Sequence, residues 1–308
     1  MTVLTIVMPS YNQGEFIEDA VNSVLENLPE REEVEFIIKD NCSDDKTHDY
    51  LNRLLHDKRV TIDVIPDKGQ SDALQSAFAT AKGEILCWLN SDDVLIKDSL
   101  TTVITYFKKN KETDIVYGKA LFMDKKGEIT NIYPTGPFNT SLLLNTCYLS
   151  QPSVFFRRSI YKQINGINPQ LKYCLDYDLW VRFSLVDARF AYLPQYLSAT
   201  RQYEETKTAT GGAEFVDEIT DMLEKNVNYL PTAWVLYKEY EQLKNNSNSS
   251  KYWLYFKAWC HFLIKHKGTK QEALDVLKHH LSQRVFNKCK VLTIRGTHFS
   301  QLLIKNKV

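Results

Sequence analysis

The sequence predicts an α/β protein with a Rossmann-like, mostly parallel sheet flanked by helices and a helical C-terminal extension. Three observations lead to this fold class. Short apolar runs alternate with segments of helical spacing through the first 117 residues, polar turns follow the apolar runs, and only helical patterns follow Gly211-Gly212. Alternation of strands and helices is typical of a parallel sheet with helices on both faces.

The elements can be placed in order along the chain. Apolar runs predict strands at 3–8, 34–38, 60–65, 85–89 and 115–117. Helical spacing predicts helices at 16–25, 45–55, 71–81, 100–110 and 177–186, with Ser71 as an N-cap and Gly83 after the third helix. We therefore expect a catalytic domain over 1–212 and a helical, basic region over 213–308.

Composition indicates a soluble globular protein. The chain has 308 residues, of which 44% are hydrophobic and 25% charged. Six scattered cysteines lack metal-ligand spacing and are expected to be reduced thiols. No apolar run approaches the roughly 20 residues of a membrane span, and residues 1–8 are typical of a strand rather than a leader. The expected location is the cytoplasm.

Charge is unevenly spread along the chain. Residues 251–308 hold 12 basic and 2 acidic residues, a balance of +10, in a chain whose formal net charge is zero. An aromatic stripe between Tyr252 and Leu263 is flanked by lysines. Such stripes usually pack on a core. The basic balance instead favours the hypothesis of peripheral docking on the anionic inner leaflet of a membrane.

Polar clusters follow four of the predicted strands. They are Ser10-Tyr11-Asn12, Asp40-Asn41, Asp67-Lys68-Gly69 and Asn90-Ser91-Asp92-Asp93. Ligands of open parallel sheets bind outside the carboxyl ends of the strands. We therefore expect these four clusters to form one crevice.

The fourth cluster carries the strongest chemical signal. An apolar strand runs directly into Asp92 and Asp93, and Mg²⁺ is typically held by one or two carboxylates together with substrate phosphates. The alternative is a pair of acids that cap a helix beginning near Val94. Two acids after a buried strand favour a metal that holds a nucleotide diphosphate.

Taken together, the ordered motifs resemble those of the family-2 inverting glycosyltransferases, which have the GT-A fold. The resemblance covers roughly residues 3–207. It rests on Val7–Asn12, Asp40–Asp44, Asp67–Ala73, Asn90–Asp93 and Leu175–Trp180. The resemblance implies transfer of a sugar from a nucleotide donor to a glycan hydroxyl.

The resemblance also implies roles for the residues at the strand ends. The loop with Pro9 and Tyr11 would contact the nucleobase, and Asp40 would accept a hydrogen bond from a base N–H, commonly that of uracil. The alternative for Asp40 is capping of its own turn. Lys68 and Gly69 would lie against the diphosphate, although a solvated turn is an equal alternative.

Further residues are assigned by the same resemblance. Asn90 and Ser91 stand in the DxD position, where Asn90 replaces the first acid and would accept from ribose hydroxyls. Asp92 would be the main ligand of Mg²⁺ or Mn²⁺, with Asp93 as its helper. Asp72 would lie near the donor sugar or the diphosphate; its alternative role is to stabilise the N-terminus of a helix through the helix dipole. Arg201 and Lys207 would close over the diphosphate. Tyr203 stands at the position where histidine is common in the family.

Asp176 is the candidate general base, because a carboxylate within reach of the acceptor hydroxyl can remove its proton. Leu175 replaces the usual preceding acid and would raise the pKa of Asp176. Asp178 is the fallback base, and an N-cap role is the alternative for Asp176. Gln151 and Trp180 are candidates for sugar contacts, although an aromatic residue at helical spacing, such as Trp180, is more often part of a core.

The predicted function is therefore an inverting, metal-dependent glycosyltransferase. A UDP-sugar is the favoured donor, and a glycan or lipid-linked glycan of surface polysaccharide or glycolipid assembly is the expected acceptor; no nucleic-acid partner is expected. The alternative is a catalytically weak nucleotide-sugar or glycan-binding protein on the same scaffold, since Asn90 and Leu175 replace motif acids. The missing GxGxxG and GxxxxGK[ST] motifs argue against dinucleotide oxidoreductases and P-loop kinases.

Overall fold

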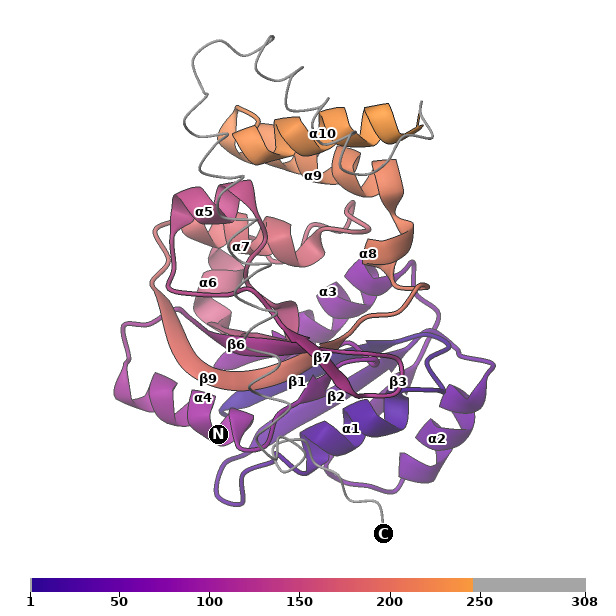
Figure 1. The fold of residues 1–308 in the computed structure, drawn as a ribbon. Helices are drawn as coiled ribbons and strands as arrows, with labels where there is room; N and C mark the ends of the chain where they lie inside the picture. Colours follow the sequence, from indigo (N-terminus) through magenta and orange to yellow (C-terminus); the bar gives the residue numbers. More distant parts are fainter. Residues whose placement is uncertain (1, 246–308) are drawn as a thin grey trace.

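The computed structural model describes residues 2–245, which form a central sheet of nine strands with helices on both faces (Figure 1). The strand order is β3-β2-β1-β4-β8-β6-β9-β5, and β7 pairs with β6 outside this path. The strands are β1 (Leu4–Ser10), β2 (Val34–Asp40), β3 (Thr61–Val64), β4 (Ile85–Trp88), β5 (Val94–Leu95), β6 (Ile115–Met123), β7 (Ile129–Ile132), β8 (Val154–Arg157) and β9 (Phe190–Arg201).

The four strands that precede the predicted crevice are parallel. β1 pairs in parallel with both β2 and β4, and β2 pairs in parallel with β3. In this register Ser10 lies beside Asp40, and Asp40 beside Val64, so the carboxyl ends meet at one edge. β8 is antiparallel to both β4 and β6. The predicted α/β class is confirmed, with a sheet that becomes mixed beyond β4.

The helices cover the sheet in two layers (Figure 1). α1, α2 and α4 pack on one face, and α3, α5, α6 and α7 on the other. Residues of β1 alternate between the two layers: Val7 faces α3 and α7, whereas Ile6 and Met8 face α1 and α4. The helices are α1 (Ile17–Leu25), α2 (Lys46–Leu54), α3 (Gln70–Thr80), α4 (Ser99–Lys109), α5 (Thr140–Asn145), α6 (Arg158–Gln163), α7 (Leu175–Leu185), α8 (Lys207–Thr210), α9 (Gly212–Val227) and α10 (Thr232–Asn245).

Two local predictions are corrected by the structure. Ser71 is not an N-cap, because α3 begins one residue earlier after Gly69, and the Ser71 hydroxyl donates to the carbonyl of Pro169 (3.4 Å). Gly69 has a φ of +116°, which glycine adopts without a steric penalty. Residues 94–95 form strand β5 rather than a helix start, so Asp92 and Asp93 do not cap a helix.

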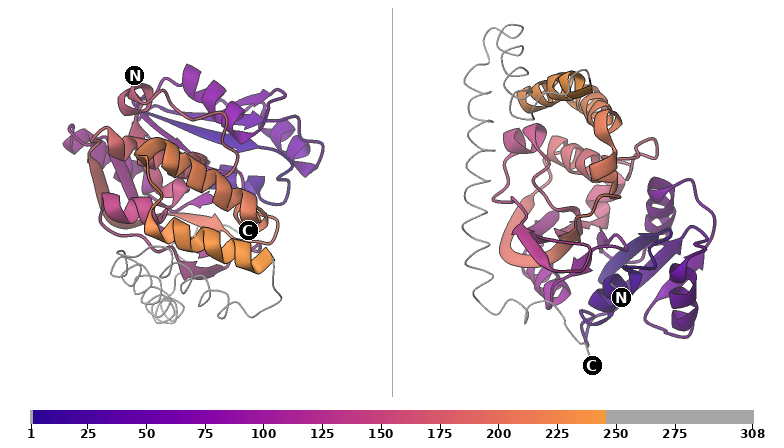
Figure 2. Two further views of the ribbon diagram at one scale, coloured as in Figure 1. Left: turned by 90° about the horizontal axis from the view of Figure 1, so that it is seen from above. Right: turned by 45° about the vertical axis from the view of Figure 1, so that its right-hand side comes forward.

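α9 and α10 lie together beyond α5 and α7 (Figures 1 and 2). α9 begins at Gly212, the predicted boundary, while the division into two domains stays a prediction. The basic segment 251–308 and its proposed docking lie outside the described residues. Within 2–245, Cys42, Cys87, Cys147 and Cys174 are free thiols, and none of the helices there is both long and apolar enough for a membrane span.

Candidate active site

A cavity of about 470 Å³ opens at the carboxyl ends of the parallel strands. This volume is within the usual range for small-molecule sites. All four predicted polar clusters contribute to its wall, together with the segment after β9. The lining residues are Pro9, Ser10, Tyr11, Gln13, Asn41, Asp67, Gly69, Gln70, Ala73, Asn90, Ser91, Asp92, Asp93, Thr200, Arg201, Tyr203, Glu205, Thr206 and Lys207.

One end of the cavity is formed by Tyr11, Asn41 and Asp67. Tyr11 is 57% exposed at the rim. The Asn41 side-chain oxygen accepts from the Asp67 backbone N–H (2.8 Å), and Asp67 accepts from the Gly69 N–H (2.7 Å), which fixes both side chains. Burial raises the pKa of Asp67 above its ordinary value. An apolar ring beside amide and carboxylate groups suits a nucleobase.

Asp40 is not part of this wall. Its carboxylate accepts from the backbone N–H (2.8 Å) and the hydroxyl (2.6 Å) of Ser43, and it is 1% exposed. The structure thus places Asp40 in the turn-capping role, the alternative to the predicted base contact. The carboxylate that lines this end of the cavity is Asp67, which belongs to one of the four predicted polar clusters but was given no individual role.

The turn after β3 is also held internally. Asp72 accepts from the Lys68 backbone N–H (3.1 Å), and neither side chain lines the cavity; Gly69 does. The predicted donor contacts of Lys68 and Asp72 therefore find no support in this geometry. Asp72 instead fixes the turn that brings Gly69 and Gln70 to the cavity.

The two carboxylates of the acidic turn have different partners. Asp92 contacts the segment after β9, and Asp93 is buried against the end of β9. Asp92 accepts from the Tyr203 hydroxyl (2.9 Å), whereas Asp93 accepts from the Arg201 backbone N–H (2.9 Å) and lies 3.4 Å from the Asn90 amide nitrogen. Burial raises the pKa of Asp92, and burial together with neighbouring Asp92 raises that of Asp93 well above its usual range. The charge of Arg201 opposes both shifts.

Asn90 and Ser91 tie the turn to its neighbours. The Asn90 oxygen accepts from the Gln70 amide (2.7 Å), and the Ser91 hydroxyl donates to the Pro9 carbonyl (3.1 Å). Asn90 can donate to the buried Asp93, which an aspartate in its place would repel. This contact is a physical reason for the amide at the position where the motif has an acid.

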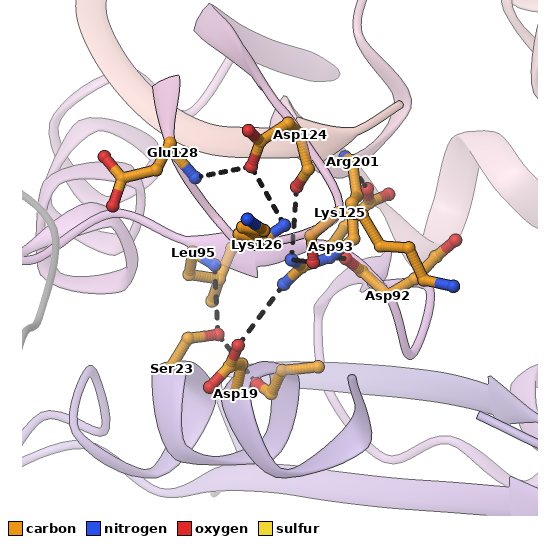
Figure 3. A network of polar contacts seen from close by, with 11 residues as sticks. Asp19, Ser23, Asp92, Asp93, Leu95, Asp124, Lys125, Lys126, Glu128 and Arg201 are labelled. Carbon is orange, nitrogen blue, oxygen red and sulfur yellow. Dashed lines mark hydrogen bonds and ion pairs between the residues drawn. The ribbon is translucent and has the colours of Figure 1, made fainter. Parts of the chain in front are cut away.

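The Arg201 side chain is committed to the protein interior (Figure 3). Its Nε donates to the Asp92 carbonyl (2.9 Å), and its other nitrogens contact the carbonyls of Asp124 and Lys125 and the carboxylate of Asp19. The guanidinium also lies 4.6 Å from the centre of the Phe16 ring. Arg201 therefore fixes the acidic turn, and its predicted closure over the diphosphate is not what this geometry shows.

Tyr203 and Lys207 bring the segment after β9 to the cavity. The Tyr203 ring packs on Phe16 with centroids 5.1 Å apart while its hydroxyl reaches Asp92. The Lys207 ammonium donates to the Gln70 oxygen (2.8 Å), and burial lowers its pKa. Lys207 lines the cavity, and its contact with a diphosphate stays a prediction; its partner Gln70 lies within the Asp67–Ala73 motif but was given no role of its own.

Asp176 lies in the first turn of α7, partly exposed. Burial raises its pKa to about 6, against the opposing effect of the Tyr177 backbone N–H. Asp178 is instead 1% exposed and paired with Arg182 (2.6 Å) and with the Asn226 amide (3.2 Å). Because the N-cap residue of α7 is Cys174, Asp176 does not occupy the cap position.

Packing connects the start of α7 with the cavity, although Asp176 is not one of the lining residues. Trp180, one helical turn after Asp176, stacks on Trp88 with centroids 5.9 Å apart, and Trp88 precedes Asn90 by two residues. Trp180 is fully buried, which confirms its core alternative. Gln151 is buried and donates to the Trp88 carbonyl (2.7 Å).

The acidic turn fits a divalent cation that shares its ligands with a substrate. Within residues 2–245 no three His, Cys, Asp or Glu side chains group into a complete metal site. Asp92 and Asp93 at the cavity nevertheless match Mg²⁺ or Mn²⁺, which keep waters and phosphate oxygens as further ligands.

Sequence comparison decides the family. The sequence model of the family described as glycosyl transferase family 2 matches residues 5–165, more than half of the chain. The chain belongs to glycosyl transferase family 2. The match includes the strands β1 to β4 and the acidic turn, and it ends before Asp176.

Curated relatives of this family-2 chain are distant. An uncharacterized glycosyltransferase of Rickettsia conorii is 25% identical over 195 residues, 59% of this chain and 31% of its own length. The chondroitin synthase of Pasteurella multocida is 28% identical over 186 residues, 60% of this chain and 19% of its own. The chain thus matches less than a third of the length of either relative.

Solved structures show the same fold. S. aureus TarS 1-349 in complex with UDP-GlcNAc has a TM-score of 0.60 at 17% identity, covering 90% of this chain and 81% of that one. The mannosyltransferase PcManGT from Pyrobaculum calidifontis, in complex with GDP-Man and Mn²⁺, has a TM-score of 0.55 at 15% identity, covering 91% and 79%. The chain has the GT-A fold of these neighbours.

Proposed function

We propose that this family-2 glycosyltransferase moves a sugar, with inversion, from a nucleotide-diphosphate donor to a hydroxyl of a glycan in surface polysaccharide or glycolipid assembly. The observation that carries the proposal is the cavity whose lining joins Tyr11 and Asp67 at one end to the acidic turn at Asp92. Similarity to a chondroitin synthase supports a glycan acceptor, and the UDP-GlcNAc bound to TarS supports a UDP-sugar donor.

The reaction requires one proton transfer. The acceptor hydroxyl oxygen attacks the anomeric carbon, the bond from that carbon to the diphosphate oxygen breaks, and the nucleoside diphosphate leaves. Asp176 takes the hydroxyl proton. A carboxylate with a pKa of about 6 is ionised at neutral pH and is a stronger base than an ordinary aspartate.

The donor-side residues supply charge and position. Asp92 would hold Mg²⁺ or Mn²⁺, with Asp93 behind it, and the ion would neutralise charge on the departing diphosphate. Lys207 adds a second positive charge once its ammonium leaves Gln70. Tyr203 must give up its hydrogen bond to Asp92, or share that carboxylate, when the cation binds.

A second candidate is a catalytically weak nucleotide-sugar-binding protein on the same fold. It is favoured by the amide at Asn90 and by the internal partners of Asn90 and Asp92. The two candidates share donor binding and differ in turnover.

Two measurements separate these candidates. A thermal-shift series with UDP-GlcNAc, UDP-glucose and GDP-mannose, each with and without Mn²⁺, tests donor binding, since a ligand of the folded state raises its melting temperature. Release of nucleoside diphosphate from the stabilising donor tests turnover, with Asp176→Asn as the inactive variant and exposed Asp187→Asn as its control. Absence of any donor shift would overturn the proposal; binding without turnover would favour the second candidate.

A further inference from the structure

The loop before α7 is held by one carboxylate from α9. Glu218 accepts the consecutive backbone N–H groups of Lys172 (2.7 Å), Tyr173 (2.6 Å) and Cys174 (2.8 Å). Hydrogen bonds to an ionised acceptor are roughly twice as strong as neutral ones. Three such bonds to one residue fix the path by which the chain enters α7.

Further residues of α9 contact the same region. Glu214, one turn before Glu218, accepts from the Tyr173 hydroxyl (3.0 Å), and Asn226, two turns after it, donates to Asp178 (3.2 Å). Spacing of four and eight residues places these side chains on one side of the helix. α9 thus contacts α7 from the entry loop to the second acidic residue.

The position of Glu218 separates it from the donor machinery. It is not among the residues that line the cavity, and it lies beyond residues 5–165, which match the family. Its bonds end at Cys174, the N-cap residue of α7, two positions before Asp176.

We propose that Glu218 is a positioning residue that fixes the first turn of α7 and limits the access of water to Asp176. This inference rests on the proposed role of Asp176 as the general base. While Glu218 is bonded to the loop, Asp176 stays partly buried in the first turn of α7. When the bonds are lost, the entry loop opens and Asp176 becomes more hydrated.

This arrangement has a consequence for pH dependence. Burial is the main reason for the raised pKa of Asp176, so an opened loop lowers that pKa toward the ordinary value. Among the described residues, Tyr133, Cys147, Cys174 and Tyr177 lie close enough to Asp176 for its charge to contribute to their raised pKa values. Burial raises the pKa of each, so all four are neutral at pH 5–8 and add no titration of their own.

Amide hydrogen exchange tests the positioning role without any assumption about the reaction. The Asp178 N–H bonds the Cys174 carbonyl and reports the first turn of α7, and the amides of β1 report the intact sheet. The variants are Glu218→Gln and Glu218→Ala, and the control is Asp221→Asn, an exposed acid of the same helix. We expect Asp178 exchange to rise about tenfold or more, equivalent to about 1.4 kcal/mol, while β1 and the control stay unchanged. Unchanged Asp178 exchange, or an equal rise in β1, would overturn the proposal.

Kinetics with the best donor of the UDP-GlcNAc, UDP-glucose and GDP-mannose series test the link to catalysis. We expect both Glu218 variants to lower kcat about tenfold or more, to leave the donor KM within about twofold, and to move the acid limb of kcat to lower pH. If the Glu218 variants kept the kcat of the parent and the acid limb of its pH profile, the link between Glu218 and catalysis would be overturned. If Asp176→Asn were active, the proposed base would fail instead, and the exchange data would still decide whether Glu218 fixes the loop.

Discussion

The donor cavity and the start of α7 hold their acidic residues in opposite ways. At the cavity, Asp92 and Asp93 have partners from distant segments, Tyr203 and the backbone of Arg201. Asp176 lies in the first turn of α7. Burial raises its pKa to about 6, and hydrogen bonding from the backbone of its own helix only partly offsets this rise. The first arrangement fixes charges in place, and the second keeps a proton acceptor basic.

The difference teaches how each region would respond to substrate. A cation or diphosphate at the cavity must replace internal hydrogen bonds such as Tyr203–Asp92 and Lys207–Gln70. Asp176 needs no exchange of side-chain partners, because Asp178 takes the pairing with Arg182 and Asn226. Substitutions in the two regions should therefore change different measured quantities.

Replacement of the base should have the largest effect. We expect Asp176→Asn to lower kcat by about 10²–10⁴-fold, the usual contribution of a general base, and to leave donor affinity unchanged. Steady-state release of nucleoside diphosphate checks this, with Asp187→Asn as the control. An active Asp176→Asn enzyme would show that the proton goes elsewhere.

Replacement of the cavity carboxylate should instead act on binding. Asp92→Asn removes a charge but keeps an oxygen that can accept from Tyr203. We expect the donor affinity with Mn²⁺ to fall by at least about 10–100-fold, the range known for weaker, outer-shell changes. Calorimetric titration with and without Mn²⁺ measures it, and equal affinities for parent and variant would remove Asp92 from the cation site.

Arg201 should act on stability. Arg201→Lys cannot reproduce the contacts with Asp92, Lys125 and Asp19, and we expect the free energy of unfolding to fall by about 2–3 kcal/mol. Urea unfolding gives the value. The control is Arg189, which forms an exposed ion pair with Glu112. Arg189→Lys should change the free energy of unfolding by less than about 0.5 kcal/mol. Equal values for both variants would show that the Arg201 network does not hold the fold.

The raised pKa of Asp176 also predicts a gain in stability when its charge is removed. The pKa is about 6 in the folded state and near 3.8 when unfolded, so the folded chain binds the proton more tightly. The cost of the buried charge is full above about pH 6 and mostly disappears as pH falls toward 4. We expect Asp176→Asn to raise the free energy of unfolding at pH 7.5 by about 1–2 kcal/mol, and by only about a fifth of that at pH 4. A variant less stable than the parent at pH 7.5 would contradict the shift.

Tyr203 should give the smallest effect. Tyr203→Phe keeps the ring on Phe16 and removes the hydroxyl bonded to Asp92. Because the carboxylate is then free of a competing donor, we expect the Mn²⁺ concentration that gives half of the thermal shift to fall about three- to tenfold. Tyr229→Phe, at an exposed tyrosine, is the control. A higher Mn²⁺ requirement would mean that the hydroxyl helps to hold the cation.

Much of the parallel half of the fold could be predicted from sequence. The runs before Pro9, Asp40 and Asn90 are apolar on both faces because helices cover both sides of the sheet, and this pattern is visible in one chain. The mixed half was harder to predict. β6 and β9 pair with register shifts near Gly118 and Lys119, which depend on contacts far apart in sequence.

The site shows the same division. Asp92, Asn90 and Tyr11 could be placed at the cavity because strand ends converge in a parallel sheet. The sequence could not predict that Asp40 bonds to Ser43, or that Arg201 bonds to three backbone carbonyls. The partner of a polar side chain depends on the tertiary structure. Glu218 had no signal at all, since its partners are backbone N–H groups that exist at every residue except proline.

The pH dependence of kcat tests the assignment of Asp176 most directly. At a saturating concentration of the donor identified by thermal shift, we expect kcat to rise with pH through a single ionisation near 6, where burial places this carboxyl group. Asp176→Asn should lose that ionisation together with its activity. A parent profile that stays flat from pH 5 to 8, or an Asp176→Asn enzyme with the parent's acid limb, would contradict the account.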